Sequence, residues 1–190
     1  MKKTDAREAA SELRHGWRLV MASLITVYAL SLWPSVARAD SAEEFVRLGE
    51  RIHGGFGSYV ALNVRIGLDA RERLQAKGRQ LEVTLFDGPT SPCPCIADGL
   101  LLSTLATPGR GTLRVSMQPA GYGQLGVVLV RDRESEEILR FTIPDTLRAR
   151  LDEWNRTDTP LARYEALMSA PAAELYVVET LGADTAPHVH

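Results

Sequence analysis

An apolar run near the N-terminus constrains this chain most, because it decides which residues can fold as a domain. The run, LVMASLITVYALSLW (19–33), contains no charged residue and follows a segment that carries five basic and three acidic residues. Small residues, Ala37 and Ala39, come directly after it in VARAD. A positive flank, an apolar run and small residues at a cleavage site are typical of a secretory signal peptide. We therefore predict a signal peptide over 1–39, cleaved before Asp40.

The apolar run is short for a membrane-spanning helix. It has fifteen residues, whereas a helix needs roughly 20 to cross the bilayer. The segment before the run is long for a signal peptide, so retention as an inner-membrane anchor stays open as the alternative. Contact with a membrane is expected only in that case. The localisation that we predict is exported, either periplasmic or extracellular.

The chain after the predicted cleavage site is long enough for one domain. It has 151 residues, with 16 Lys plus Arg and 21 Asp plus Glu, a net charge of −5. A chain of this length buries most of its apolar surface on folding. Nucleic-acid binding needs clustered positive charge, which is absent here, so we expect no nucleic-acid partner. The predicted organisation is one domain over 40–182 followed by a flexible C-terminal tail over 183–190.

The first half of the domain reads as two helices, a strand and a third helix. Ser41 and Glu44 form a capping box before helical apolar spacing over 42–52. A second helix is predicted over 59–77, where Gly67 permits close packing. QLEVTLFD (80–87) alternates apolar and polar residues, as a half-buried strand does, and 96–106 fits a short buried helix.

The second half is predicted to be mostly strands. We expect strands over 112–118, 124–131 and 137–143, the last two joined as an antiparallel hairpin. Helices near 145–153 and 160–169 and a final strand near 174–181 complete the chain. This order of elements indicates the α+β class, as a single domain with a mixed sheet.

The two cysteines of the chain lie in GPTSPCPCIADGL (88–100). Cys95 should lie at the start of the helix near Ile96, where free N–H groups and the helix dipole stabilise a thiolate. Asp98 falls in the first turn, where it is expected to cap the helix. Three interpretations stay open: a strained disulfide between Cys93 and Cys95, ligation of a soft metal together with His53, or packing alone.

Two further segments could contribute to a site. His53 lies where a helix gives way to the glycine-rich HGGFGS (53–58); an imidazole there could face a cleft or simply end the helix. TPGRG (107–111) could present backbone N–H groups and the Arg110 guanidinium to an anion, or it could be an ordinary turn. No nucleophile triad, phosphate-binding loop or dinucleotide motif occurs in the sequence, which weakens any claim of enzyme activity.

The residues at these junctions resemble the E-subunit family of formylmethanofuran dehydrogenase. That family carries His-Gly-His-x-Cys-Pro-Gly, Cys-x-x-Asp-Ala and Gly-Cys-Thr-x-Gly-Lys-Gly-Asn-Leu segments. HGGFGSYVALNVRIGL (53–68) is similar to the first, and CIADGLLLSTLATPGRGTL (95–113) aligns without a gap to the others. The matching residues are His53, Gly54, Cys95, Asp98, Thr107, Gly109, Gly111 and Leu113. The resemblance covers about 44–181 and implies a mixed sheet with helices on one face.

The chain also departs from the family pattern. Gly55 replaces the second histidine, Gly57 the first cysteine, Ala106 the later cysteine and Arg110 the lysine, and we expect no zinc ribbon after the domain. Imidazole and thiol groups suit zinc and similar ions, and most of that ligand set is missing here. His53 and Cys95 alone cannot form a closed tetrahedral site.

These observations favour an exported binding protein that holds a transition metal, zinc or copper, or a small anionic ligand. The predicted ligand-binding residues are His53, Asp98, Thr107 and Arg110, and the predicted metal ligands are His53, Cys93 and Cys95. Two alternatives are a thiol-dependent redox protein or enzyme that uses Cys95, and a non-catalytic scaffold or accessory subunit, for example a homodimer. Oxidation of formylmethanofuran is not expected, because in the name-giving enzyme the metal cofactor belongs to other subunits.

Overall fold

The structure, a computed structural model, describes residues 41–76, 79–92 and 95–182. These residues belong to one structural unit, Asp40–His190. The predicted signal peptide (1–39), Cys93 and the predicted tail (183–190) lie outside the described residues.

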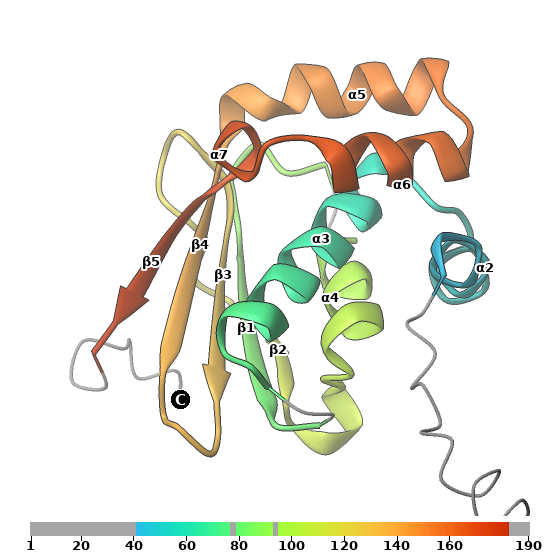
Figure 1. The fold of residues 1–190 in the computed structure, drawn as a ribbon. Helices are drawn as coiled ribbons and strands as arrows, with labels where there is room; N and C mark the ends of the chain where they lie inside the picture. The colour runs from blue at the N-terminus through green and yellow to red at the C-terminus, as the bar shows by residue number, and fades with distance from the viewer. Residues whose placement is uncertain (1–40, 77–78, 93–94, 183–190) are drawn as a thin grey trace, which may run out of the picture. The chain divides into compact units, whose positions relative to one another are not determined.

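A five-stranded mixed sheet forms the centre of the fold (Figure 1). Its order is β2-β1-β3-β4-β5; β1 and β2 are parallel, and the other neighbours are antiparallel. The strands are β1 (Leu81–Asp87), β2 (Leu113–Val115), β3 (Gln124–Asp132), β4 (Ile138–Pro144) and β5 (Val177–Leu181).

The alternation of apolar residues in β1 sets which face of the sheet is buried. Leu81, Val83 and Leu85 are at most 1% exposed, and Val83 pairs with Val130 and Leu85 with Val128 in the neighbouring β3. Side chains two apart on a strand share a face, so these residues form one apolar layer. The helices of the domain pack over this layer, on one side of the sheet (Figure 1).

Two helices, α3 (Ser58–Arg73) and α4 (Ile96–Thr104), pack closely against each other in that helical layer. In the middle of their contact lie two buried glycines, Gly67 of α3 and Gly99 of α4. A Cβ on Gly67 would lie 2.0 Å from Ser103 Oγ, and one on Gly99 would lie 2.2 Å from the backbone oxygen of Val60. The predicted close approach at Gly67 is therefore confirmed. The helices before the hairpin are α2 (Ala42–His53), α3 (Ser58–Arg73), α4 (Ile96–Thr104) and the 3-10 turn η1 (Pro108–Arg110).

The segment after β4 returns across one end of the domain before it adds the last strand. In this segment, α6 (Pro160–Ser169) packs on α2 and α3, and α5 (Arg148–Thr157) packs on α3. The elements of this segment are η2 (Asp145–Leu147), α5 (Arg148–Thr157), α6 (Pro160–Ser169) and α7 (Ala172–Leu175). None of the helices within the described ranges is both long and apolar enough to span a membrane.

The structure confirms the predicted fold class, a single α+β domain with a mixed sheet. Ser41 caps α2 as predicted, because its Oγ accepts a hydrogen bond from the backbone N–H of Glu44. The boundaries differ in places: α3 ends at Arg73, β2 has three residues, and a short helix precedes β5 where the prediction had only strand.

Candidate functional site

The start of α4 lies at the carboxyl end of β1. The chain leaves β1 at Asp87 and enters α4 at Ile96, and α4 leads to the parallel strand β2. The carboxyl ends of parallel strands are where sheets joined by helices commonly bind ligands. Cys95 is the N-cap of α4 and Asp98 lies in its first turn. Because residues three apart are neighbours on a helix surface, Cys95 and Asp98 lie next to each other at the start of α4.

His53 reaches this end of α4 from the last turn of α2. The helix ends there because Gly54 adopts a left-handed conformation (φ 85°) and its N–H bonds back to the carbonyl of Glu50. Glycine takes that conformation without a steric penalty. α2 lies against α4, and the buried ring of Phe45 fixes it to the core.

The side chains of His53 and Asp98 form a hydrogen-bonded pair. His53 Nδ1 lies 2.8 Å from Asp98 Oδ2, although the two residues are 45 positions apart. An ionised carboxylate only accepts, so Nδ1 donates and Nε2 is left as the other ring nitrogen. The two side chains are 33% and 32% exposed, so the pair is open to solvent. Asp98 therefore orients the imidazole from the first turn of α4, and the expectation that it also caps the helix stays a prediction.

The loop that follows His53 is fixed by side chains from the C-terminal half of the domain. Arg163 donates from Nη1 to the carbonyl of Phe56 (2.9 Å), and also to the carbonyls of Trp154 and Asn155. Asn155 Oδ1 accepts from the backbone N–H of Ser58 at 2.8 Å. Asn155 and Arg163 were not predicted from the sequence, because no local pattern shows that α5 and α6 lie beside this loop.

Asn155 also lies close to the position at which the family pattern has its first cysteine. A Cβ on Gly57 would be 3.3 Å from Asn155 Oδ1, whereas one on Gly55 would meet nothing within 4 Å. The space beside Gly57 is therefore occupied by an amide that holds the loop, while the space beside Gly55 is open. The two positions at which the family pattern has a histidine and a cysteine, Gly55 and Gly57, therefore differ in whether a longer side chain would find free space.

The sulfur of Cys95 is disulfide-bonded, and the residue is 7% exposed. A sulfur in a disulfide is not a thiolate, so it offers no strong bond to a metal ion. The other cysteine, Cys93, was predicted as a metal ligand and lies outside the described residues.

Thr107 and Arg110 lie past the other end of α4. Arg110 donates to the backbone carbonyls of Leu105 and Arg79, each at 3.0 Å. The Thr107 carbonyl accepts from Thr112 and Leu113 among others. Both residues thus stabilise the turn between α4 and β2, and a nine-residue helix separates them from the His53–Asp98 pair. The structure brings His53 and Asp98 together at one end of α4, and it places Thr107 and Arg110 at the other.

A buried carboxyl group lies at the end of β1, before the loop that leads into α4. Burial raises the pKa of Asp87, and a hydrogen bond from Ser91 offsets part of this effect. Asp87 Oδ1 is buried and has no hydrogen-bond partner within the described part of the chain. Asp87 pairs with Gly126 in the sheet, and Gly126 lies beside the Ile96 side chain, so this carboxyl lies near the first turn of α4.

The described part of the chain does not supply a closed metal site. No three His, Cys, Asp or Glu side chains converge among the described residues. The donors at the start of α4 are one imidazole nitrogen and the carboxylate that orients it. A metal ion bound there would keep open positions for water or a small anion.

The fold and the site define a class: an α+β domain whose parallel crossover helix begins beside an oriented histidine. A family model described as "FmdE, Molybdenum formylmethanofuran dehydrogenase operon" matches residues 52–178, a range that begins just before His53 and ends in β5. The chain therefore belongs to the FmdE family. Among curated proteins, none matches this chain.

Proposed function

We propose that this FmdE domain is exported and that His53, oriented by Asp98, binds a transition-metal ion such as zinc or copper. The observation that carries the proposal is the 2.8 Å hydrogen bond between His53 Nδ1 and Asp98 Oδ2. Histidine ligands of metals commonly donate their second ring N–H to a carboxylate, which fixes the ring and makes the other nitrogen more basic. Here that leaves Nε2 to bind the metal.

A metal ion held by His53 would keep most of its coordination positions open, so the proposal is a binding role and assigns no reaction. One imidazole provides a single strong bond, so water or a small anionic ligand would complete the coordination. The same site could hold a small anion without any metal if the imidazole is protonated, because Nε2–H would then donate to the anion. These two versions share His53 and differ in whether a metal is needed.

The metal version predicts a loss of affinity in two site variants. The protein is purified from the exported fraction of an expressing bacterium, and N-terminal sequencing is expected to begin at Asp40. All variants carry His188→Ala and His190→Ala, because these two histidines, which lie outside the described residues, could bind metal themselves. Titration with Zn²⁺ or Cu²⁺ is expected to show binding that His53→Ala reduces at least tenfold and Asp98→Asn reduces about 10- to 100-fold.

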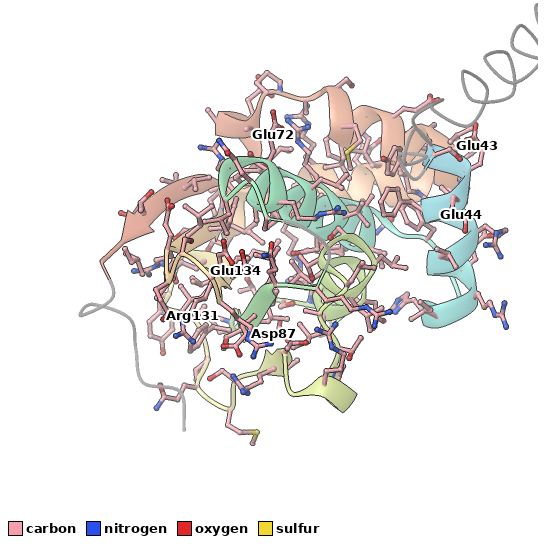
Figure 2. All side chains as sticks on the ribbon, turned by 60° about the horizontal axis from the view of Figure 1, so that its bottom comes forward. Glu43, Glu44, Glu72, Asp87, Arg131 and Glu134 are labelled. Atoms are coloured by element: carbon pink, nitrogen blue, oxygen red, sulfur yellow. The ribbon has the colours of Figure 1, made fainter. Side chains whose placement is uncertain are left out.

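Glu72→Gln provides the control for a lost carboxylate. Glu72 is exposed near the end of α3 (Figure 2), and the variant is expected to bind as tightly as the parent. Equal affinity in all four proteins would overturn the metal version. Binding of phosphate in the presence of a chelator, lost in His53→Ala, would instead assign the site to a small anionic ligand.

A thiol-based redox function is the second candidate, favoured by the disulfide at the N-cap of α4. After reduction, a Cys95 thiolate would be stabilised by the free N–H groups of the helix start. We expect reduced Cys95 to react with iodoacetamide at pH 7 at least tenfold faster than a model thiol. Cys93→Ser removes the competing thiol for this measurement, and a rate no faster than the model thiol would count against the redox function.

A further inference from the structure

The side of the sheet opposite the helical layer carries a hollow of about 450 Å³. Its lining comes from β1, β3, β4, β5 and the connection between β2 and β3, and from no helix. His53 and Asp98 are not part of it. We call it the sheet hollow; six of its lining residues are Phe86, Pro119, Val127, Leu129, Arg140 and Leu181.

The floor of the sheet hollow is apolar. Phe86 pairs with Val127 in the sheet, and Leu129 lies two residues further along β3 on the same face. Val127 and Leu129 are themselves largely covered, at 6% and 8% exposed, so the accessible apolar surface of the hollow comes mainly from the half-buried Phe86 and Leu181 and the exposed Pro119. An apolar floor of this kind favours a ligand with a hydrocarbon or aromatic body.

The connection between β2 and β3, which also lines the hollow, is fixed to the sheet by hydrogen bonds. The backbone N–H of Ala120 donates to the carbonyl of Asp87 at 2.8 Å. The N–H of Gly121 donates to Gln124 Oε1 at 3.0 Å. The hollow is therefore formed in the free protein, and its volume falls within the range of sites for small molecules, roughly 300–1,000 Å³.

One positive charge lies in the lining. Arg140 Nε is buried and has no hydrogen-bond partner among the residues that the structure describes, and the oxygen with which it forms an ion pair there, Glu179 Oε2, is 4.0 Å away. That distance is too long for a hydrogen bond. The Arg140 side chain as a whole is 38% exposed, so a ligand carboxylate in the hollow can pair with the accessible part of the guanidinium.

We infer that the sheet hollow binds a small monocarboxylate with an apolar body, such as a medium-chain fatty acid. The apolar body lies on Phe86, Pro119 and Leu181, and the carboxylate pairs with Arg140. A single guanidinium beside an apolar floor suits one carboxylate and an apolar chain better than a phosphate group with several charges. Glu179 competes with the ligand for the same guanidinium.

The test is a titration of the mature chain with decanoate, measured by calorimetry. Arg140→Gln is expected to weaken decanoate binding at least tenfold, and Glu179→Gln to tighten it about threefold because the competing carboxylate is removed. Arg131→Gln is the matched control. Arg131 lies on the same face of β3, is paired with Glu82 and Glu136 and does not line the hollow, so a change of less than twofold is expected.

Two further measurements keep the inference falsifiable. Decanol lacks the carboxylate, so its binding should be weaker and should not change in Arg140→Gln. Absence of decanoate binding, or equal weakening in Arg140→Gln and Arg131→Gln, would overturn the inference. A chain that ends after Gly182 should bind decanoate as the parent does; tighter binding there would assign the hollow to the chain's own C-terminal segment and would also overturn it.

Discussion

Alanine at Gly99 is expected to lower the free energy of unfolding by at least about 3 kcal/mol, the upper end of what overpacking a core costs. The added Cβ would lie 2.2 Å from the carbonyl oxygen of Val60 and 2.9 Å from Asn63 Cβ. The Val60 oxygen belongs to the backbone of α3, so no side-chain rotation relieves the clash. α3 and α4 would have to separate, which would open the middle of the helical layer.

Urea unfolding followed by circular dichroism measures this effect, with Gly109→Ala as the control. Nothing lies within 4 Å of a Cβ on Gly109, and its φ is not in the left-handed range, so a change of less than about 0.5 kcal/mol is expected. Gly67→Ala should fall between the two, because its closest neighbour is the Ser103 side chain. Equal stability of Gly99→Ala and Gly109→Ala would contradict the close packing of the two helices.

The fold was largely predictable because local patterns and burial agree along most of the chain. In β1, the alternation of Leu81, Val83 and Leu85 matches the face that the helices cover. The β3–β4 hairpin follows from two apolar strands with a short charged connection. In these segments the same residues determine both the local conformation and the tertiary contact.

The boundaries were less predictable where tertiary structure decides the conformation. The predicted second helix continued to 77, but α3 ends at Arg73, and Gln75 has a positive φ of 49°. β2 has only three residues and pairs only with β1, at the edge of the sheet. Apolar spacing alone does not carry this information.

The candidate site was predictable only in part, because its key contact joins distant segments. His53 and Asp98 were both predicted as site residues, but nothing in their spacing shows that their side chains bond. Arg110 was assigned to the same site because arginine suits anions, yet its guanidinium bonds to two backbone carbonyls at the far end of α4. Only the position of α4 in the fold separates these two environments.

Replacing Arg163 with methionine is expected to destabilise the domain by about 3 kcal/mol, although the residue is neither in the apolar core nor in the candidate site. Its guanidinium donates to the carbonyls of Phe56, Trp154 and Asn155. Hydrogen bonds from a charged group are worth about 1.5–3 kcal/mol each, with losses that are not additive. Methionine keeps much of the apolar packing and removes all three donors. Lysine should recover only part of the loss, because its ammonium lacks the planar fork that reaches several carbonyls.

Arg156→Met is the matched control for that change. Arg156 lies in α5, is 70% exposed and pairs only with Glu153 among the described residues, so its loss should change stability by less than about 1 kcal/mol. Comparing Arg163→Met with Arg156→Met shows whether the loss of stability comes from the three carbonyl contacts of Arg163 or from removing any arginine of this region. Since Arg163 holds the carbonyl of Phe56, three residues after His53, the Arg163 variant is also expected to weaken metal binding at temperatures where it remains folded. Unchanged metal affinity in folded Arg163→Met would mean that the Asp98 hydrogen bond alone positions the imidazole.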